Sequence, residues 1–192
     1  MRPPTFGKDQ ILDAAEDLLR QYGLEKTNIV DVAKALGVSQ SAVYKHFPTK
    51  NAVREAVAQR WLHRLSKPLQ AVADRTGPAP KVLRAWFLAL IALKRKKVRD
   101  DRLLFETYRA LAETTGGSIV EHIDVLLLQI TNIMERGIEA GEFRPVDPKA
   151  TAVALLNGTS GFHHPHFVSR SPEPTKVEIK TLLDLLLAGL AP

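Results

Sequence analysis

One run of residues near the N-terminus constrains the fold more than any other part of the chain. Residues 27–50, TNIVDVAKALGVSQSAVYKHFPTK, carry the signals of a helix, a tight turn and a second short helix. Gly37 follows the last apolar residue of the first helix, where a left-handed backbone is easiest for glycine. Ser39 is placed to cap the second helix, and Pro48 is placed to end it. The pattern predicts a helix-turn-helix.

The two faces of the second helix differ in chemistry. Val43 and Phe47 are four residues apart and are expected to point inward together, as apolar residues on one helical face do. The opposite face carries polar side chains, namely Gln40, Ser41, Tyr44 and Lys45. A helix presented in this way fits the major groove of DNA, where such side chains reach base edges and phosphates. The pattern indicates sequence-specific DNA binding; the alternative is an ordinary helix pair within an all-α core.

The flanking segments complete a small domain. A helix over about residues 8–22 is predicted, with Gly23 at its end and a stripe formed by Ile11, Ala15, Leu18 and Tyr22, with Leu12 and Leu19 alongside. Thr27 is expected to cap the next helix, and Thr49 to cap a fourth, longer helix that runs past Trp61. Between Ser39 and Arg64 five basic residues stand against one acid, a net charge of +4. Such a concentration of positive charge is typical of a phosphate-binding surface.

The segment from Ile11 to Lys50 resembles the DNA-binding domain of the TetR/AcrR family of bacterial transcriptional repressors. The residues that carry the resemblance are Ile11, Ala14, Ala15, Gly23, Thr27, Ile29, Val32, Ala33, Gly37, Val38, Ser39, Tyr44, Phe47 and Lys50. A second segment, GIEAGEFRPVDPKATAVALLNGTSGF from Gly137 to Phe162, resembles the family's junction between a long helix and the first dimerisation helix. The resemblance implies a ligand-responsive repressor that leaves a palindromic operator when a small molecule binds.

Apolar periodicity predicts further helices after the break at Gly77, Pro78 and Pro80. They cover about residues 81–97, 101–113, 118–140, 148–161 and 175–188, which makes some nine helices and no convincing strand. The predicted fold is therefore all-α. We assign residues 1–50 to a helix-turn-helix DNA-binding domain, about 50–74 to a connecting fourth helix, and 75–192 to a helical ligand-sensing and dimerisation domain.

The resemblance also implies roles for individual residues. Tyr44 and Lys50 should hold phosphates, while Gln40, Ser41 and Lys45 should approach bases. With the two helix caps, the predicted DNA-binding set is Thr27, Ser39, Gln40, Ser41, Tyr44, Lys45 and Lys50. The last two long helices should meet their copies in a homodimer as a four-helix bundle, because a two-fold operator requires two reading helices. The predicted interface residues are Ala152, Leu155, Leu156, Thr159, Leu182, Leu183 and Leu186. The alternative is a buried C-terminal helix.

In the same family the C-terminal domain encloses a small molecule whose binding moves the fourth helix. Aromatic or polar residues in the apolar helices are candidates for that pocket, namely Trp86, Phe105, Tyr108, Arg109, His122, Gln129, Asn132, Phe162 and His163. The alternative is that the aromatic rings are ordinary core and the polar groups are surface. A competing hypothesis is a TetR-fold DNA-binding protein without a small-molecule sensor, acting through protein–protein interaction, as in chromosome or division control.

Two clusters outside these sets have more than one interpretation. Residues 162–167 hold His163, His164 and His166, which could bind zinc or copper; without cysteine or a carboxylate at ligand spacing we expect no metal. The basic run at residues 94–99 could grip an anionic ligand such as a coenzyme A thioester. We favour its interpretation as the solvated end of a helix, where cations suit the helix dipole.

Composition excludes several classes of protein. There are no cysteines among the 192 residues, which excludes disulfides and thiolate chemistry and suits a reducing cytoplasm. The N-terminus lacks the pattern of a signal peptide, and the longest apolar runs are too short to cross a bilayer, so we expect a cytoplasmic protein without membrane contact. Catalytic motifs are missing, so neither an enzyme nor a cofactor is predicted. The formal net charge of +6 favours an anionic partner.

Overall fold

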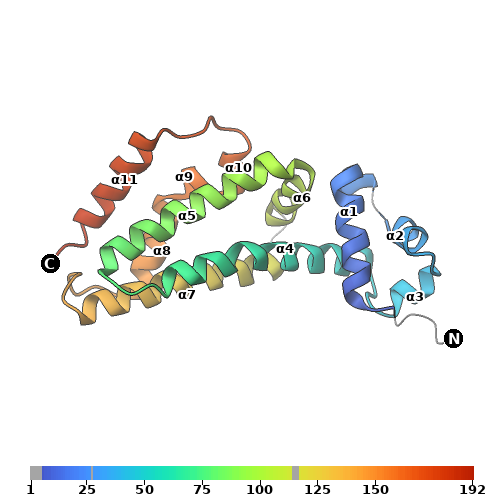
Figure 1. Cartoon of the computed structure of the whole chain (residues 1–192), viewed down its shortest axis with the longest axis horizontal. Helices are drawn as coiled ribbons and strands as arrows, with labels where there is room; N and C mark the ends of the chain where they lie inside the picture. Colours follow the sequence, from blue (N-terminus) through green and yellow to red (C-terminus); the bar gives the residue numbers. More distant parts are fainter. Residues whose placement is uncertain (1–5, 27, 114–116) are drawn as a thin grey trace. The chain divides into compact units, whose positions relative to one another are not determined.

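The computed structural model describes residues 6–26, 28–113 and 117–192, with side chains described except at positions 24–26, 108 and 111–113. Over these ranges the chain forms eleven α-helices and no strand, which confirms the predicted all-α fold (Figure 1). The helices are divided between two compact units, of which unit 1 comprises Met1–Leu62 and Asp100–Val120, and unit 2 comprises His63–Arg99 and Glu121–Pro192. None of the described helices is long and apolar enough to cross a membrane.

Unit 1 contains the N-terminal helices and one helix from the middle of the chain. Its elements are α1 (Lys8–Lys26), α2 (Ile29–Leu36), α3 (Gln40–Tyr44), the first half of α4 (Lys50–Ala73) and α6 (Arg102–Glu113). α1 packs against both α2 and α6. The indole of Trp61 meets the ring of Phe105 edge-on, with centroids 6.1 Å apart, and both side chains are fully buried. An apolar contact thus joins α4 to α6 within unit 1.

The buried stripe of α1 differs from the predicted one. It runs through Ile11, Ala15 and Leu19, and it includes the carboxylate of Glu16, which is 2 % exposed. Tyr22, predicted to lie on this stripe, is instead 54 % exposed, because the stripe is rotated toward Glu16 and its arginine partners. Gly23 has φ 73° and ψ −176° and breaks the helix where the sequence predicted its end.

Unit 2 is built around two long helices. Its elements are α5 (Ala79–Asp100), α8 (Pro148–Gly158), α9 (Ser160–His163), α10 (Pro165–Val168) and α11 (Lys176–Ala188). It also contains the second half of α4 and all but the first turn of α7 (Gly117–Glu139). α8 is shorter than predicted because Thr159, at φ −96° and ψ 1°, leaves the helical conformation. The short α10 occupies part of the segment that was predicted to be a loop. Pro68 lies inside α4 and removes one backbone donor from that helix.

The end of α7 shows how tightly unit 2 is packed. A Cβ atom on Gly137 would lie 2.2 Å from Cδ2 of Phe143 and 2.8 Å from Cβ of Ala79. The backbone then turns back, and Glu142 Oε2 accepts a hydrogen bond of 2.6 Å from the first backbone N–H of α5, at Ala79. The segment that follows α7 therefore closes one end of the unit 2 core.

Candidate functional site

The turn between α2 and α3 has the geometry that the sequence predicted. Gly37 adopts φ 65° and ψ 29°, and its N–H donates to the carbonyls of Ala33 and Lys34. Ser39 is extended, and its hydroxyl accepts from the Ala42 N–H at 3.3 Å, which caps α3. The cap of α2 is a correction: Asn28 Oδ1 accepts from the Asp31 N–H at 3.0 Å, so Asn28 is the cap in place of Thr27. Asparagine fills this role as well as threonine does.

The helix α3 is short, and its inner face is anchored beyond its last turn. Val43 is fully buried, and Phe47, which follows the helix, is 6 % exposed. The backbone N–H groups of His46 and Phe47 both donate to the Val43 carbonyl at 3.0 Å. Lys8 Nζ lies 5.9 Å from the centroid of the Phe47 ring. These contacts fix the direction of α3 and leave its other face open.

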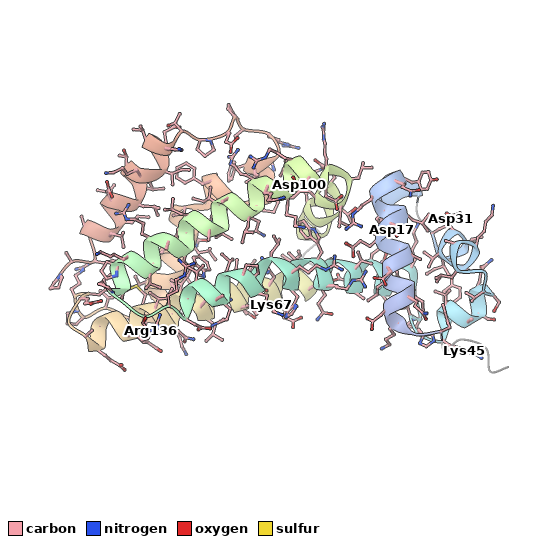
Figure 2. The ribbon with its side chains drawn as sticks, viewed as in Figure 1. Asp17, Asp31, Lys45, Lys67, Asp100 and Arg136 are labelled. Carbon is pink, nitrogen blue, oxygen red and sulfur yellow. The ribbon has the colours of Figure 1, made fainter. Side chains whose placement is uncertain are left out.

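The outward face of α3 collects most of the predicted DNA-binding residues. Ser39, Gln40, Ser41, Tyr44 and Lys45 are all exposed. Tyr44 exposes 45 % of its surface, although a tyrosine in an ordinary helix pair would bury more of its ring. Lys45 extends from the end of α3 and is labelled in Figure 2. Lys50 begins α4 and is half-buried, and Thr27 lies outside the described residues. An exposed row of amide, hydroxyl and ammonium groups of this kind can bind bases and phosphates.

Part of the positive charge counted along the sequence is paired with carboxylates of the same chain. Arg60 Nη1 and Nη2 donate to Asp13 at 2.7 Å and to Glu16 at 2.8 Å. Glu16 also accepts from Arg20, so one buried carboxylate bridges two guanidinium groups. Arg60 therefore ties α4 to α1, and its charge is paired within unit 1.

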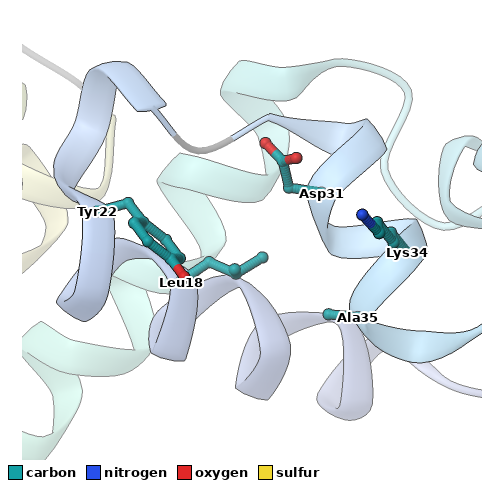
Figure 3. Close-up of a pocket in the computed structure, with 5 residues that line it drawn as sticks. All are labelled: Leu18, Tyr22, Asp31, Lys34 and Ala35. Carbon is teal, nitrogen blue, oxygen red and sulfur yellow. The ribbon is translucent and has the colours of Figure 1, made fainter.

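A shallow groove lies on another side of unit 1, between α1 and α2 (Figure 3). It has a volume of about 470 Å³ and is lined by Leu18, Tyr22, Asp31, Lys34 and Ala35. Tyr22 and Leu18 come from α1, and the other three come from α2. The exposed Tyr22 therefore lines part of this groove and does not contribute to the core.

The interior of unit 2 contains polar groups that join its helices. Trp86 Nε1 on α5 donates to Gln129 Oε1 on α7 at 2.9 Å, and Gln129 Nε2 donates to the Ser66 carbonyl on α4 at 3.3 Å. Further along the same two helices, Lys94 Nζ lies 3.2 Å from His122 Nε2. Two polar contacts therefore join α5 to α7.

His163 on α9 brings a third basic group toward this cluster. Its Nε2 donates to the Leu156 carbonyl at 3.2 Å and lies 3.2 Å from the Thr159 hydroxyl. Lys94, His122 and His163 are at most 6 % exposed. Burial lowers the pKa of Lys94 from 10.5 to about 7. Burial and then the charge of Lys94 lower the pKa of His122 to about 2 and of His163 to about 4.

The predicted pocket residues are divided by the structure. Trp86, His122, Gln129 and His163 gather in the buried interior of unit 2, and Phe162 is half-buried beside His163 in the chain. Asn132 is exposed. Phe105 and Arg109 belong to unit 1, where Phe105 packs on Trp61 and Arg109 pairs with Glu106. The side chain of Tyr108 lies outside the described residues.

Sequence reasoning missed Lys94. The basic run was interpreted as a solvated helix end, but Lys94 and Arg95 are 2 % and 7 % exposed. Arg95 Nη1 donates to the Pro172 carbonyl at 3.3 Å, which explains its burial under the loop between α10 and α11. A signal was available, because Lys94 lies four residues after Leu90 and eight after Trp86, on the buried face of α5.

The histidine-rich segment is held by ring contacts. The rings of His164 and His166 lie 5.9 Å and 5.4 Å from the ring of Phe167. Within the part of the chain that the structure describes, no group of three histidine, aspartate or glutamate side chains is arranged to hold a metal ion.

The predicted interface residues lie mostly inside the single chain. Ala152, Leu155, Leu156, Thr159 and Leu183 are buried in unit 2, and Leu182 and Leu186 are half-buried. The surface that α8 and α11 leave open to a partner is formed by the faces that carry their exposed residues. On α8 the exposed residues include Val153, Ala154, Asn157 and Gly158, and on α11 they include Val177 at 72 % and Leu185 at 69 % exposed.

An all-α chain in which a tight turn presents an open reading helix, together with a second helical unit, defines a helix-turn-helix DNA-binding regulator. Comparison with known families agrees. Residues 11–57 match the model of bacterial regulatory proteins of the tetR family, and residues 79–180 match the tetracyclin repressor-like C-terminal domain. The second match alone covers more than half of the chain, and the chain belongs to the TetR family of transcriptional regulators.

Several characterised and uncharacterised regulators are similar to this chain. An HTH-type transcriptional regulator of Mycobacterium tuberculosis is 29 % identical over 65 % of this chain, and the match spans only 60 % of that relative's length. RutR of Escherichia coli is 23 % identical over 95 % of this chain and 84 % of its own. The nucleoid occlusion factor SlmA of Vibrio atlanticus is 26 % identical over 80 % of each. The fold is similar to that of SmeT, the repressor of a Stenotrophomonas maltophilia efflux pump, with TM-score 0.70 and 23 % identity over 98 % of this chain and 92 % of SmeT.

Proposed function

We propose that this TetR-family regulator is a homodimeric repressor that binds a palindromic operator through α3 and is released when a small molecule binds inside unit 2. The observation that carries the proposal is the exposed polar face of α3, presented by a glycine turn and backed by an apolar core. SmeT, whose fold is similar, is a repressor.

The residues in and beside α3 that we assign to DNA, here called the reading surface, fall into two groups: those that can reach base edges and those that can reach phosphates. Gln40, Ser41 and Lys45 lie in and just after a helix that can enter the major groove, so we assign them to base edges. Tyr44 and Lys50 are assigned to phosphates. The exposed Ser39 flanks this surface and, with the predicted Thr27, is assigned to the backbone as well. Phosphate contacts set position and salt dependence, whereas base contacts set sequence preference.

The hydrogen bonds between α5, α7 and α4 in unit 2 connect the proposed ligand site to α4. Gln129 bonds Trp86 on α5 and the Ser66 carbonyl on α4, and Arg136 donates to the Ala73 carbonyl near the end of α4. A ligand that displaced Gln129 would therefore change the bonds that hold α4 in unit 2. Because Lys50 is the first residue of α4 and belongs to the reading surface, a shift of α4 would also shift Lys50. Release requires only that the ligand favours one arrangement by a few kcal/mol.

For the dimer, we propose a four-helix bundle formed by α8 and α11 with their copies. The exposed apolar residues Val153, Val177 and Leu185 support this surface, with the half-buried Leu182 and Leu186 beside them. Exposed large apolar side chains on neighbouring helices are typical of an interface. The buried Ala152, Leu155, Leu156, Thr159 and Leu183 would then support it from inside each protomer.

A second candidate is a DNA-binding protein that acts through a protein partner and has no small-molecule sensor. The observation that favours it is the similarity of this chain to SlmA, a nucleoid occlusion factor. The two candidates differ in their response to small molecules. Both require DNA binding, so the same reading surface serves either of them.

The decisive experiment is the selection of bound fragments from random and genomic DNA by the purified protein, followed by ligand release. A palindrome with half-sites about one helical turn apart would support the repressor. Enrichment of a palindrome that no compound from a broad metabolite panel releases would favour the SlmA-like candidate. If a folded dimer enriches no sequence, the proposed DNA-reading function is wrong.

A further inference from the structure

The groove between α1 and α2 presents apolar side chains to solvent. Tyr22 lines it and exposes 54 % of its surface, Leu18 is half-buried, and Ala35 on α2 is exposed (Figure 3). None of these residues belongs to the reading surface. A small molecule in so shallow a groove would stay open to water, whereas ligand pockets cover most of the ligand. Tyrosine is enriched in protein interfaces, so the groove is better suited to a protein surface.

The charges of the groove come from α2. Asp31 and Lys34 are three residues apart, so they are neighbours on the surface of that helix. Both line the groove, and neither side chain forms an ion pair with any residue of the described ranges. The carboxylate of Asp31 would repel a DNA phosphate, so the groove is not an extension of the reading surface. Two opposite charges side by side suit a partner that carries the same two charges in reverse order.

A second copy of this chain is such a partner. In a contact related by a two-fold axis both protomers use the same patch, and every contact between two different residues is made twice. Two α2 helices that meet in antiparallel orientation bring Asp31 of one protomer to Lys34 of its partner, and the reverse pair forms as well. The exposed Ala35 is small, which allows the two helices to approach closely. The groove is therefore complementary in charge to itself.

We infer that the α1–α2 groove joins neighbouring dimers of this protein on one DNA duplex, which rests on the proposed operator binding. Two identical palindromes on a duplex have a further two-fold axis midway between them, so dimers bound there can meet in a two-fold contact. Unit 1 carries both the reading surface and the groove. The contact differs from the proposed α8–α11 interface, which joins the two protomers of one dimer.

The size of the groove predicts that this contact acts only on DNA. Five side chains line it, whereas a stable interface uses about 20–30 residues from each partner. Exposed ion pairs also contribute little by themselves. Two dimers on one duplex are held at a high effective concentration, however, so a weak contact becomes measurable as cooperative binding. Without DNA the protein should remain a single dimer.

The test is cooperative binding of the full-length protein to duplexes that carry one or two copies of the selected operator. The distance between the two copies is varied in single base-pair steps over one helical turn, and electrophoretic mobility shift measures each binding step. We expect the second dimer to bind about tenfold more tightly than the first at one spacing. Half a turn away this advantage should disappear, because the second dimer then lies on the opposite face of the duplex.

Variants of the groove residues separate this contact from operator binding. Tyr22→Ser should abolish the tenfold advantage and leave the affinity for a single operator unchanged. Asp31→Lys should also abolish it, because like charges then face each other, and Asp31→Lys combined with Lys34→Asp should restore it. Glu135→Lys makes the same change of charge at an exposed residue of α7 and should keep the advantage. Circular dichroism checks that each variant is folded.

Cooperativity that is absent at every spacing would overturn the inference. Cooperativity that persists in both Tyr22→Ser and Asp31→Lys would also overturn it, because the dimers would then touch elsewhere. If the double substitution does not restore what Asp31→Lys removes, the charge pairing is wrong. A folded protein that binds neither duplex would overturn the proposed operator binding, whereas one that binds single operators without cooperativity would overturn only this inference.

Discussion

Arg20 Nε on α1 donates to Asp101 Oδ2 across 2.6 Å, although 81 residues separate them in sequence. Asp101 also accepts from the Leu104 N–H and so caps α6, which means that one carboxylate both begins a helix and docks it on α1. The same guanidinium contacts the buried Glu16, whose other oxygen accepts from Arg60 on α4. Three helices of unit 1 are thereby joined by one chain of ion pairs.

The first prediction concerns the centre of this network. Glu16→Gln should lower the free energy of unfolding by about 2 kcal/mol, because it leaves two guanidinium groups beside an uncharged amide in a partly buried site. Urea denaturation at pH 8 measures the change. Asp17→Asn removes the exposed partner of Arg20 and should cause no measurable loss. Equal effects of the two substitutions would contradict the role given to Glu16.

The second prediction separates base reading from phosphate binding. Lys50→Ala should weaken operator and random DNA alike and lower the slope of log K against log salt by about 2 per dimer, since two phosphate contacts are lost. Lys45→Ala should weaken the operator more than random DNA. Fluorescence anisotropy over a salt series measures both. Lys34→Ala, an exposed lysine at the α1–α2 groove, is the matched control and should bind as the unaltered protein does.

The third prediction follows from the buried bases. Lys94, His122 and His163 have native pKa values of about 7, 2 and 4, below their ordinary values of 10.5, 6.5 and 6.5. Between the native and ordinary values the unfolded chain binds a proton that the native chain does not, so acidification favours unfolding. Stability should fall from pH 10.5 to 7 through Lys94 and fall again below pH 6.5 through the histidines.

This pH dependence can be measured by urea denaturation between pH 5 and 10. Each group contributes at most about 1.4 kcal/mol per pH unit within its own window. Lys94→Met should raise the stability at pH 7 and flatten the curve between pH 7 and 10, because it removes the buried ammonium. A slope above pH 7 that is unchanged in this variant would show that Lys94 does not cause it.

The fourth prediction tests the closed end of unit 2. Gly137→Ala should destabilise the protein by about 1–3 kcal/mol, because the new methyl group would collide with the buried ring of Phe143. Gly161→Ala is the control, since nothing lies within 4 Å of a Cβ atom there. Thermal unfolding of both variants gives the comparison. A Gly137→Ala variant as stable as the control would mean that the ring can move aside.

The fifth prediction concerns the dimer. Leu185→Glu should shift the protein toward monomer by placing a charge in the proposed α8–α11 interface, while its helix content remains unchanged. Leu128→Glu makes the same substitution at another exposed leucine, 61 % exposed on α7, and should leave the dimer intact. Light scattering with circular dichroism distinguishes loss of association from loss of folding. Two variants with the same mass would contradict the assigned interface.

Local signals were sufficient for much of the DNA-reading unit. Gly37, Ser39 and Thr49 act within a few residues of themselves, through a left-handed backbone and through side-chain caps on neighbouring N–H groups. For that reason the turn and the exposed face of α3 could be predicted residue by residue. The same local logic placed the start of α11 at Thr175, whose hydroxyl and Glu178 form a capping box.

Local signals did not suffice where a side chain's role depends on distant partners. Nothing local in the sequence marks Glu16 as buried, and the approach of Arg60 from α4 explains its burial. Gly137 is required because Phe143 and Ala79 occupy the space beside it. In each case the deciding contact is made by an element whose presence can be predicted from apolar periodicity. The position of that element in space cannot be predicted in this way.

The sequence by itself determined the all-α fold, the helix-turn-helix and the family, because periodicity, caps and turn residues act over a few positions. Only the tertiary structure decided which polar residues are buried. Lys94 and His122 are 28 residues apart and meet at 3.2 Å because α5 and α7 pack side by side. The free energy of a buried charge depends on everything that surrounds it in space, and that environment is assembled only when the helices come together.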